Sequence, residues 1–384
     1  MKRNALSFWI HFTLLLVGLA LVLCLTACSE PTASEPTPTQ EPFHTDENTD
    51  GVCDGCKETL DYLYDEESRT YTVYTAEGLY VWSNVESGFI TASLTLAKDI
   101  TLPAEMKYDL NGDGVCESNW QPKIFEGTID GNHHTISNLV IHSSGNEIGF
   151  IGSLHADSII QNLHLTNVSI EGAANVGGIA GYCSKNTVIT GCSAGGSITG
   201  NSSHTGGIVG QLYGGTASGC KNDATVVGEN STGGICGTLS AGGKIVACYN
   251  IGNIKSNGLA YGTMTGGIVA KVDTASVKAC YSTGIIQPGA GTNPMMGGIA
   301  GYGMNGTFTV NFWNTPEAGH PVYGIDAPKT NENAAFVDGS TVTWASAAEQ
   351  MNSTLTQGLH SWKYVVNTGA DRDICPLTLE PVAS

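Results

Sequence analysis

The sequence carries little charge, and most of that charge is acidic. Of 384 residues only 13% are charged, with 16 Lys or Arg against 35 Asp or Glu and a formal net charge of −19. Soluble domains usually carry about 25% charged residues. Nucleic-acid binding requires many cations to neutralise phosphates, so the composition excludes nucleic acid as a partner. Hydrophobic residues make up 41% of the chain, which is too many for a disordered protein.

Common catalytic signatures are also lacking. There is no Arg between Arg69 and Arg372, and no H-E-x-x-H motif occurs anywhere in the sequence. The few acidic residues of the central region are scattered, and nothing in the sequence pairs two of them as glycoside hydrolysis requires. We therefore expect a non-catalytic protein. A polysaccharide-processing enzyme, either a lyase or a glycosidase, is the alternative, because residues distant in sequence can converge on one face of a fold.

The N-terminus resembles a bacterial lipoprotein signal. Lys2 and Arg3 precede an apolar run over residues 8–23, and Leu25-Thr26-Ala27-Cys28 follows. The run is too short for a retained membrane span. The resemblance implies cleavage before Cys28, lipidation of its thiol, and anchoring to the outer face of the bacterial cytoplasmic membrane at the cell surface. An ordinary signal peptide with a chance Cys is the other interpretation. Residues 28–44 are rich in Pro, Thr, Ser and Glu, which predicts an extended tether.

A repeat of about 30 residues dominates the centre of the chain. Gly-Gly-Ile recurs at residues 177–179, 206–208, 233–235, 266–268 and 297–299, with offsets of 29, 27, 33 and 31 residues. Such a period indicates stacked structural units. Of the 50 glycines, 33 fall between Gly172 and Gly306, which favours short strands and tight turns over helices.

Aligning the repeats on their cysteines produces further columns of apolar or small residues. The Cys column contains Cys192, Cys220, Cys248 and Cys280. Ile198, Val226, Ile254 and Ile286 follow it by six residues, Ile189, Ala217, Ile245 and Val277 precede it by three, and Gly191, Gly219, Ala247 and Ala279 precede it by one. We therefore predict an all-β fold, a right-handed parallel β-helix of about six or seven coils, with equivalent side chains stacked in its interior. The Cys column should hold free buried thiols, because stacked parallel side chains rarely offer disulfide geometry.

The segment Phe125–Leu139 (FEGTIDGNHHTISNL), followed by Ile148-Gly149-Phe150-Ile151-Gly152 and the Gly-Gly-Ile units, resembles the GLUG-repeat proteins of bacterial surfaces. The turn Cys-Tyr-x-x-Gly of that family stands intact at residues 248–252 and 280–284 and departs from the pattern at residues 220–224. The resemblance covers about residues 70–315. It implies a parallel β-helix on an exported, adhesin-like or peptidase-associated protein, and it implies no catalytic residue.

Two segments predict calcium loops. Residues 46–54 and 109–117 share the pattern D-x-N-x-D-G-V-C-[D/E]. Alternating Asp and Asn side chains, a Gly turn and the following carbonyl supply hard oxygens, as in the first half of an EF-hand loop. The closing bidentate Glu is missing, so we expect weak sites. An ordinary surface turn is the alternative. The candidate ligands are Asp46, Asn48, Asp50, Val52 and Asp54 in the first loop, and Asp109, Asn111, Asp113, Val115 and Glu117 in the second.

Three cysteines lie within or beside these loops. Cys53 and Cys56 form a lone C-x-x-C, which is a weak signal for zinc or redox chemistry. A local disulfide, or a bridge to Cys116, is at least as well supported.

Both ends of a β-helix expose unpaired strand edges, so we expect caps. A short helix beginning near Thr75, with Glu77 in its first turn, is predicted on the N-terminal side. The stripe Ala347, Met351 and Leu355 predicts a helix on the C-terminal side. The expected organisation is a signal peptide (1–27), a tether (28–44), a calcium-loop-like Cys segment (45–58), the β-helix with its N-terminal cap (59–320) and a C-terminal cap (321–384).

The sequence thus favours a surface-anchored β-helix that binds a glycan or a host surface protein without turnover. An accessory module of a surface peptidase system is a further alternative. Aromatic rings commonly serve as platforms for sugars. The candidate exposed platforms are Tyr182, Tyr213, Tyr249, Tyr281 and Tyr302.

Overall fold

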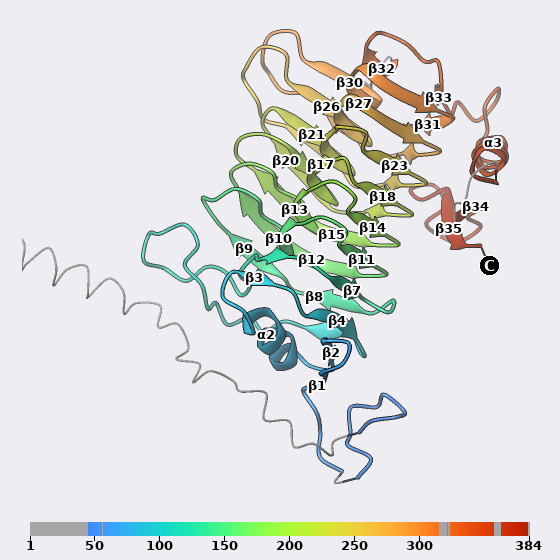
Figure 1. Cartoon of the computed structure of the whole chain (residues 1–384). Coiled ribbons are helices and arrows are strands. Elements are labelled where there is room, and N and C mark those ends of the chain that lie inside the picture. The colour runs from blue at the N-terminus through green and yellow to red at the C-terminus, as the bar shows by residue number, and fades with distance from the viewer. Residues whose placement is uncertain (1–44, 56, 315–320, 322, 357–361, 383–384) are drawn as a thin grey trace, which may run out of the picture.

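The computed structural model describes residues 45–382 except residues 56, 315–320, 322 and 357–361. The chain winds into a β-solenoid of about seven turns, whose coils stack along one axis with parallel strands (Figure 1). The predicted fold class, an all-β parallel β-helix of six or seven coils, is confirmed. The lipidation residue Cys28 and the tether lie outside the described residues.

Two long sheets form the walls of the solenoid, and a hairpin stands apart from them. The first sheet contains β1 (Tyr62–Asp65), β2 (Thr70–Val73), β3 (Phe89–Ile90), β4 (Ser93–Leu96), β6 (Ile124–Phe125), β7 (Thr128–Asp130), β10 (Ile151–Leu154), β11 (Ile159–Gln161), β13 (Ala180–Cys183), β14 (Val188–Thr190), β16 (Thr205–Gly206), β17 (Val209–Tyr213), β18 (Thr216–Ser218), β21 (Ser231–Gly233), β22 (Cys236–Ser240), β23 (Lys244–Val246), β26 (Met264–Gly266), β27 (Val269–Lys278), β30 (Met295–Thr309) and β32 (Tyr323–Ala327). The second contains β5 (Ile100–Thr101), β8 (Thr135–Ser137), β9 (Val140–His142), β12 (His164–Gly172), β15 (Ser193–Gly200), β19 (Lys221–Asn222), β20 (Thr225–Gly228), β24 (Tyr249–Asn250), β25 (Ile254–Ser256), β28 (Tyr281–Ser282), β29 (Ile286–Gln287), β31 (Asn311–Trp313) and β33 (Ala334–Phe336). The hairpin pairs β34 (Trp362–Val366) with β35 (Leu377–Pro381) in antiparallel fashion.

The interior consists of the side-chain columns that the repeat register predicts. Ile198 pairs with Val226, Val226 with Ile254, and Ile254 with Ile286 in successive parallel registers. All four are at most 3% exposed. Ile189, Ala217, Ile245 and Val277 form a second paired and buried column. The four thiols of the Cys column are buried and unbridged, as predicted.

The residue before each of these cysteines is Gly or Ala, and its backbone is left-handed. Gly191 and Gly219 have φ of 64° and 60°, and Ala247 and Ala279 both have φ of 52°. A larger or β-branched residue would be strained in that conformation.

A ladder of polar side chains runs through the interior, and the sequence analysis missed it. Asn222 donates through Nδ2 to Oδ1 of Asn250 at 2.7 Å, and Asn250 donates through Nδ2 to Oγ of Ser282 at 3.2 Å. Their amides also hold the turns, because Nδ2 of Asn222 donates to the Ala224 carbonyl and Nδ2 of Asn250 donates to the Gly252 carbonyl. All three ladder residues are fully buried.

The same ladder explains the second glycine of the Gly-Gly-Ile motif. A Cβ at Gly234 would lie 2.1 Å from the carbonyl oxygen of Gly267 and 2.5 Å from Cγ of Asn250. Backbone from the next coil and a buried amide therefore leave no room for a side chain there.

Helix α2 (Ala76–Asn84) covers the N-terminal end of the solenoid (Figure 1). Its N-cap is Thr75, whose side chain accepts a hydrogen bond from the Gly78 N–H, so the predicted helix start is confirmed. Trp82 is fully buried, and its ring stacks on Phe150 at 6.4 Å.

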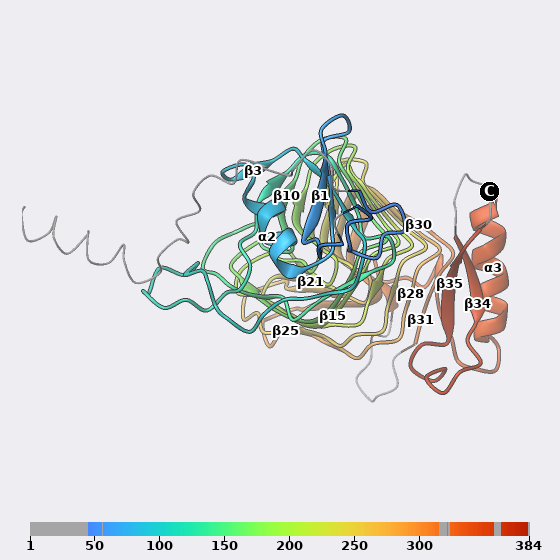
Figure 2. The same ribbon diagram turned by 90° about the horizontal axis from the view of Figure 1, so that it is seen from below.

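The C-terminal part differs from the predicted cap in two ways. The solenoid continues beyond residue 320, because β32 pairs in parallel with β30 and β33 pairs in parallel with β31. Helix α3 (Trp344–Thr356) and the β34–β35 hairpin then lie against the side of the solenoid, next to β28 and β31, rather than across its open end (Figure 2). The predicted helical stripe is confirmed, since Ala347, Met351 and Leu355 are buried.

This lateral position has a packing reason. The small residues at Gly191 and Gly219 leave a flat strip on which the Trp362 ring lies, so that a Cβ at Gly219 would be 2.1 Å from that ring.

Over the described ranges, no helix has both the length and the apolar character needed to cross a bilayer.

Candidate binding face

The third residue after each Gly-Gly-Ile isoleucine points outward from the first sheet. Strands β13, β17, β22, β27 and β30 place these residues side by side in parallel register. We call this row the outer column; it consists of Tyr182, Gln211, Thr238, Lys271 and Tyr302. At about 4.8 Å between coils, its two tyrosines are roughly 19 Å apart.

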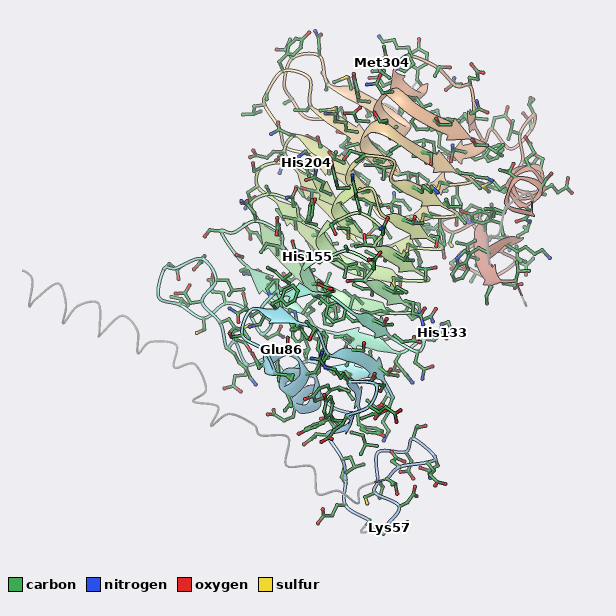
Figure 3. All side chains as sticks on the ribbon, in the orientation of Figure 1. Lys57, Glu86, His133, His155, His204 and Met304 are labelled. Atoms are coloured by element: carbon green, nitrogen blue, oxygen red, sulfur yellow. The ribbon has the colours of Figure 1, made fainter. Side chains whose placement is uncertain are left out.

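The outer column borders an inside corner of the solenoid, where the chain folds closely against its own preceding segment. A Cβ at Gly181 would meet the backbone of Glu147 at 2.4 Å, and a Cβ at Gly237 would meet the backbone of His204 at 2.6 Å. Polar side chains bridge this corner in the earlier coils. Ser153 donates to the Glu147 carboxylate, and Oγ1 of Thr238 lies 2.8 Å from Nδ1 of His204. This face runs along the solenoid axis past His155, His204 and Met304, which are labelled in Figure 3.

At the last full coils the face opens into a pocket of about 220 Å³, lined by Met264, Lys271, Asp273, Met295, Tyr302 and Asn305. Lys271 and Tyr302 come from the outer column, and Met264 pairs with Met295 in the parallel register. Nδ2 of Asn305 donates to Oδ1 of Asp273 at 3.3 Å. The pocket therefore combines an ammonium group, a carboxylate, an aromatic ring and two thioethers.

Tyr213 extends the aromatic character of the face. It is 39% exposed, and the Lys185 ammonium lies 5.6 Å from its ring centroid. Burial raises the pKa of neighbouring Tyr182 above its usual value, and the nearby Tyr213 adds to the effect. The Tyr182 phenol therefore stays neutral at physiological pH and can donate a hydrogen bond. The charge of Lys271 also affects a nearby side chain of this face. Burial lowers the pKa of His204, and the positive charge of Lys271 lowers it further.

Two of the five candidate tyrosines are not exposed, which corrects the sequence expectation. Tyr249 is 8% exposed and Tyr281 is fully buried. Their rings stack at 4.9 Å with an interplanar angle of 10°, and Tyr281 meets Tyr364 edge-on at 5.7 Å. The Tyr281 hydroxyl donates to the Leu377 carbonyl. These tyrosines point outward from the solenoid, but the chain's own α3 and β34–β35 cover them, so they cannot act as sugar platforms.

The two predicted calcium loops adopt similar hydrogen-bonded turns. The Asp46 carboxylate accepts from the N–H groups of Asp50 and Gly51 at 3.1 and 2.7 Å. The Asp109 carboxylate accepts from the N–H groups of Gly112 and Gly114 at 2.7 and 2.9 Å, so its first donor stands one position earlier in the loop.

The remaining side chains of these loops also bond locally. Asn48 accepts from the N–H of Asp50 and Asp50 from that of Val52, as Asn111 accepts from Asp113 and Asp113 from Val115. Asp54 and Glu117 each accept one further hydrogen bond, which closes the loop to which each belongs.

The loop over residues 109–117 projects from the side of the solenoid (Figure 1, teal). Hydrogen bonds from Gly112 and Gly114 hold the pKa of Asp109 below its usual value, against a smaller opposing effect of burial. Its carboxylate is therefore ionised at neutral pH, as a cation ligand must be.

The cysteines near these loops lie in different environments. Cys53 is buried beside Leu60 and Tyr74, Cys116 is disulfide-bonded, and Cys56 lies outside the described residues. Among the residues that the structure describes, no group of three or more His, Cys, Asp or Glu side chains is arranged to hold a metal ion.

Sequence reasoning found Tyr182 and Tyr302 but missed their neighbours in the pocket. Lys271 was identifiable, because it occupies the same position after Gly-Gly-Ile as both tyrosines. Asp273 follows it by two residues on the same strand and therefore points to the same side. The contribution of Met264 and Met295 depends on the inside corner, which the repeat alone does not reveal.

These features define a class: a β-helix repeat protein with one outward face of polar and aromatic residues. No model of a known protein family matches the sequence. The chain is 38% identical over 121 residues, 31% of its length, to halomucin of Haloquadratum walsbyi, and it spans only 1% of that protein's length. Its fold is similar to that of a crystal structure described as a "putative immunoglobulin A1 protease" from Bacteroides ovatus, with a TM-score of 0.53 and 18% identity over 78% of this chain and 90% of the other. At this level of identity the second similarity concerns the fold alone.

Proposed function

We propose that this chain is a surface lipoprotein of the GLUG-repeat type that binds glycans or a host surface protein and does not process them. The outer column carries the proposal, because it places the partly exposed side chains of Tyr182, Lys271 and Tyr302 in one row of parallel register. Rings and polar groups fixed in one row on a rigid sheet suit an extended polymer, which can contact them one after another along the axis.

An extracellular location agrees with two observations. Leu25-Thr26-Ala27-Cys28 follows the N-terminal apolar run, and the similarity to a protein named halomucin points the same way. In this proposal the lipid on Cys28 attaches the protein to the outer face of the cytoplasmic membrane. Metabolic labelling with a fatty-acid analogue tests the anchor: the label should appear on the expressed chain and be lost in the Cys28→Ser variant.

Calcium is proposed as a stabiliser of the loops at residues 46–54 and 109–117. Their carboxylates could bind a hard cation, and the lack of a closing bidentate Glu predicts weak affinity. In this role the ion would order a loop and take no part in ligand binding at the outer column.

A glycan and mucin array combined with an activity screen tests the proposed function. The full chain carrying Cys28→Ser should bind a subset of glycans and release no oligosaccharide. Tyr182→Ala and Tyr302→Ala should each weaken binding at least tenfold, whereas Tyr261→Ala, which removes an exposed ring outside the outer column, should not. Released product would favour the polysaccharide-processing alternative, and binding that is indifferent to both column tyrosines would remove the face from the proposal.

A further inference from the structure

The pocket beside Lys271 is a local departure from the rest of the inside corner. In earlier coils, short polar side chains bridge the corner, as Ser153 does to Glu147 and Thr238 does to His204. In the last full coils, Met264 and Met295 stand on one side and Lys271 and Tyr302 on the other. This arrangement leaves an opening of about 220 Å³. Pockets for drug-sized ligands usually exceed about 300 Å³, so this one suits a single small group.

The side chains around the pocket include apolar, basic and acidic groups. The two thioethers form an adaptable apolar wall. The Lys271 ammonium can donate hydrogen bonds, and the Asp273 carboxylate can accept them. Asn305 and Thr274 both donate to Oδ1 of Asp273, at 3.3 and 3.2 Å. Within the described part of the chain, Oδ2 therefore remains available to a ligand.

We propose that this pocket binds one N-acetylhexosamine residue of a glycan. This inference rests on the proposed function and deepens it by naming a sugar class. The acetamide needs an apolar contact for its methyl group and a donor for its carbonyl oxygen, which Met264 with Met295 and Lys271 supply. A sugar hydroxyl donates to Asp273, and the C–H face of the ring packs on Tyr302. A plain hexose lacks the acetamide and leaves the thioether wall and the Lys271 ammonium without these contacts.

Saturation-transfer NMR on the full chain with Cys28→Ser tests the inference. The probes are N-acetylglucosamine and N-acetylgalactosamine, with glucose and galactose as matched sugars that lack the acetamide. We expect at least one acetylated sugar to bind tenfold or more tightly than its matched hexose, with the strongest saturation on the acetyl methyl protons. Lys271→Met keeps most of the aliphatic stem and removes the donor, and it should reduce this preference at least fivefold. Lys244→Met, at an exposed lysine of β23, is the control and should leave the preference unchanged.

The outcomes separate this inference from the proposed function. If acetylated and plain sugars bind equally, or if the preference survives in both Lys271→Met and Tyr302→Ala, the N-acetylhexosamine assignment is wrong. Array binding that Tyr182→Ala still weakens would then leave the proposed function intact. If no glycan binds in either experiment, the inference and the glycan-binding part of the proposed function both fail. Unchanged melting temperatures of the variants would establish that any lost binding is local.

Discussion

Removing the amide of Asn250 is the sharpest test of how the repeats are held together. Asn250 is fully buried, and its side chain makes three hydrogen bonds. It accepts from Asn222 at 2.7 Å and donates to the Gly252 carbonyl at 2.9 Å and to Ser282 Oγ at 3.2 Å. Asn250→Ala removes all three bonds at once and leaves their partners in the interior.

The expected loss of stability follows from these bonds. A buried polar group that loses its partner costs about 1–3 kcal/mol. The Gly252 carbonyl loses its bond from the Asn250 side chain, whereas Asn222 keeps its bond to Ala224 and is only partly affected. Adding the small void left by the amide, we expect Asn250→Ala to lower the free energy of unfolding by about 3–5 kcal/mol.

Urea unfolding followed by far-UV circular dichroism measures this change. Asn201→Ala is the matched control, since Asn201 is exposed and its side chain donates a hydrogen bond of 2.8 Å to Glu171; its substitution should cost less than about 0.5 kcal/mol. If Asn250→Ala were no more destabilising than this control, the interior ladder would not contribute to stability as argued.

Three further predictions concern the thiols, the C-terminal contact and calcium. Burial raises the pKa values of Cys236 and Cys280 to about 12, so iodoacetamide at pH 8 should leave the core thiols of the native protein unmodified and label them after unfolding; rapid native labelling would contradict their burial. Gly219→Ala should displace Trp362 and cost about 2–4 kcal/mol in thermal unfolding, with faster proteolysis of the C-terminal part, whereas Gly242→Ala, where a Cβ meets nothing within 4 Å, should cost only about 1–2 kcal/mol for its positive φ. The weakest EF-hand modules bind calcium with dissociation constants of about 0.1–1 mM. With that affinity, 5 mM calcium should stabilise the protein by about 1–2 kcal/mol, and Asp109→Ala should reduce this stabilisation. The absence of both calorimetric heat and a thermal shift would end the calcium proposal.

The sequence was sufficient for the coil register because the repeat imposes it. Once the cysteines are aligned, every residue has an equivalent in the next coil, and parallel stacking places equivalents together. The column of Ile198, Val226, Ile254 and Ile286 could therefore be predicted without any knowledge of the turns. The same alignment contained Asn222 and Asn250 two residues after their cysteines, but a polar residue in an apolar core was not expected.

The exposure of the tyrosines could not be predicted in the same way. Tyr249 and Tyr182 both point outward from their strands, and only one is covered. The difference arises from residues more than 60 positions away, because Tyr364 and α3 pack on Tyr249 and Tyr281 but not on Tyr182. Local pattern decides which side of a strand a residue faces, whereas tertiary docking decides whether that side meets water.

Hydroxyl-radical footprinting with a bound glycan tests the binding face most directly. The full chain with Cys28→Ser is oxidised with and without a saturating concentration of the glycan that the array identifies, and the oxidation of each tyrosine is measured by mass spectrometry. We predict that Tyr182, Tyr213 and Tyr302 are protected, that exposed Tyr261 is unchanged, and that the glycan is recovered intact. Unchanged oxidation of the first three tyrosines at saturation, or a shortened glycan, would contradict the account.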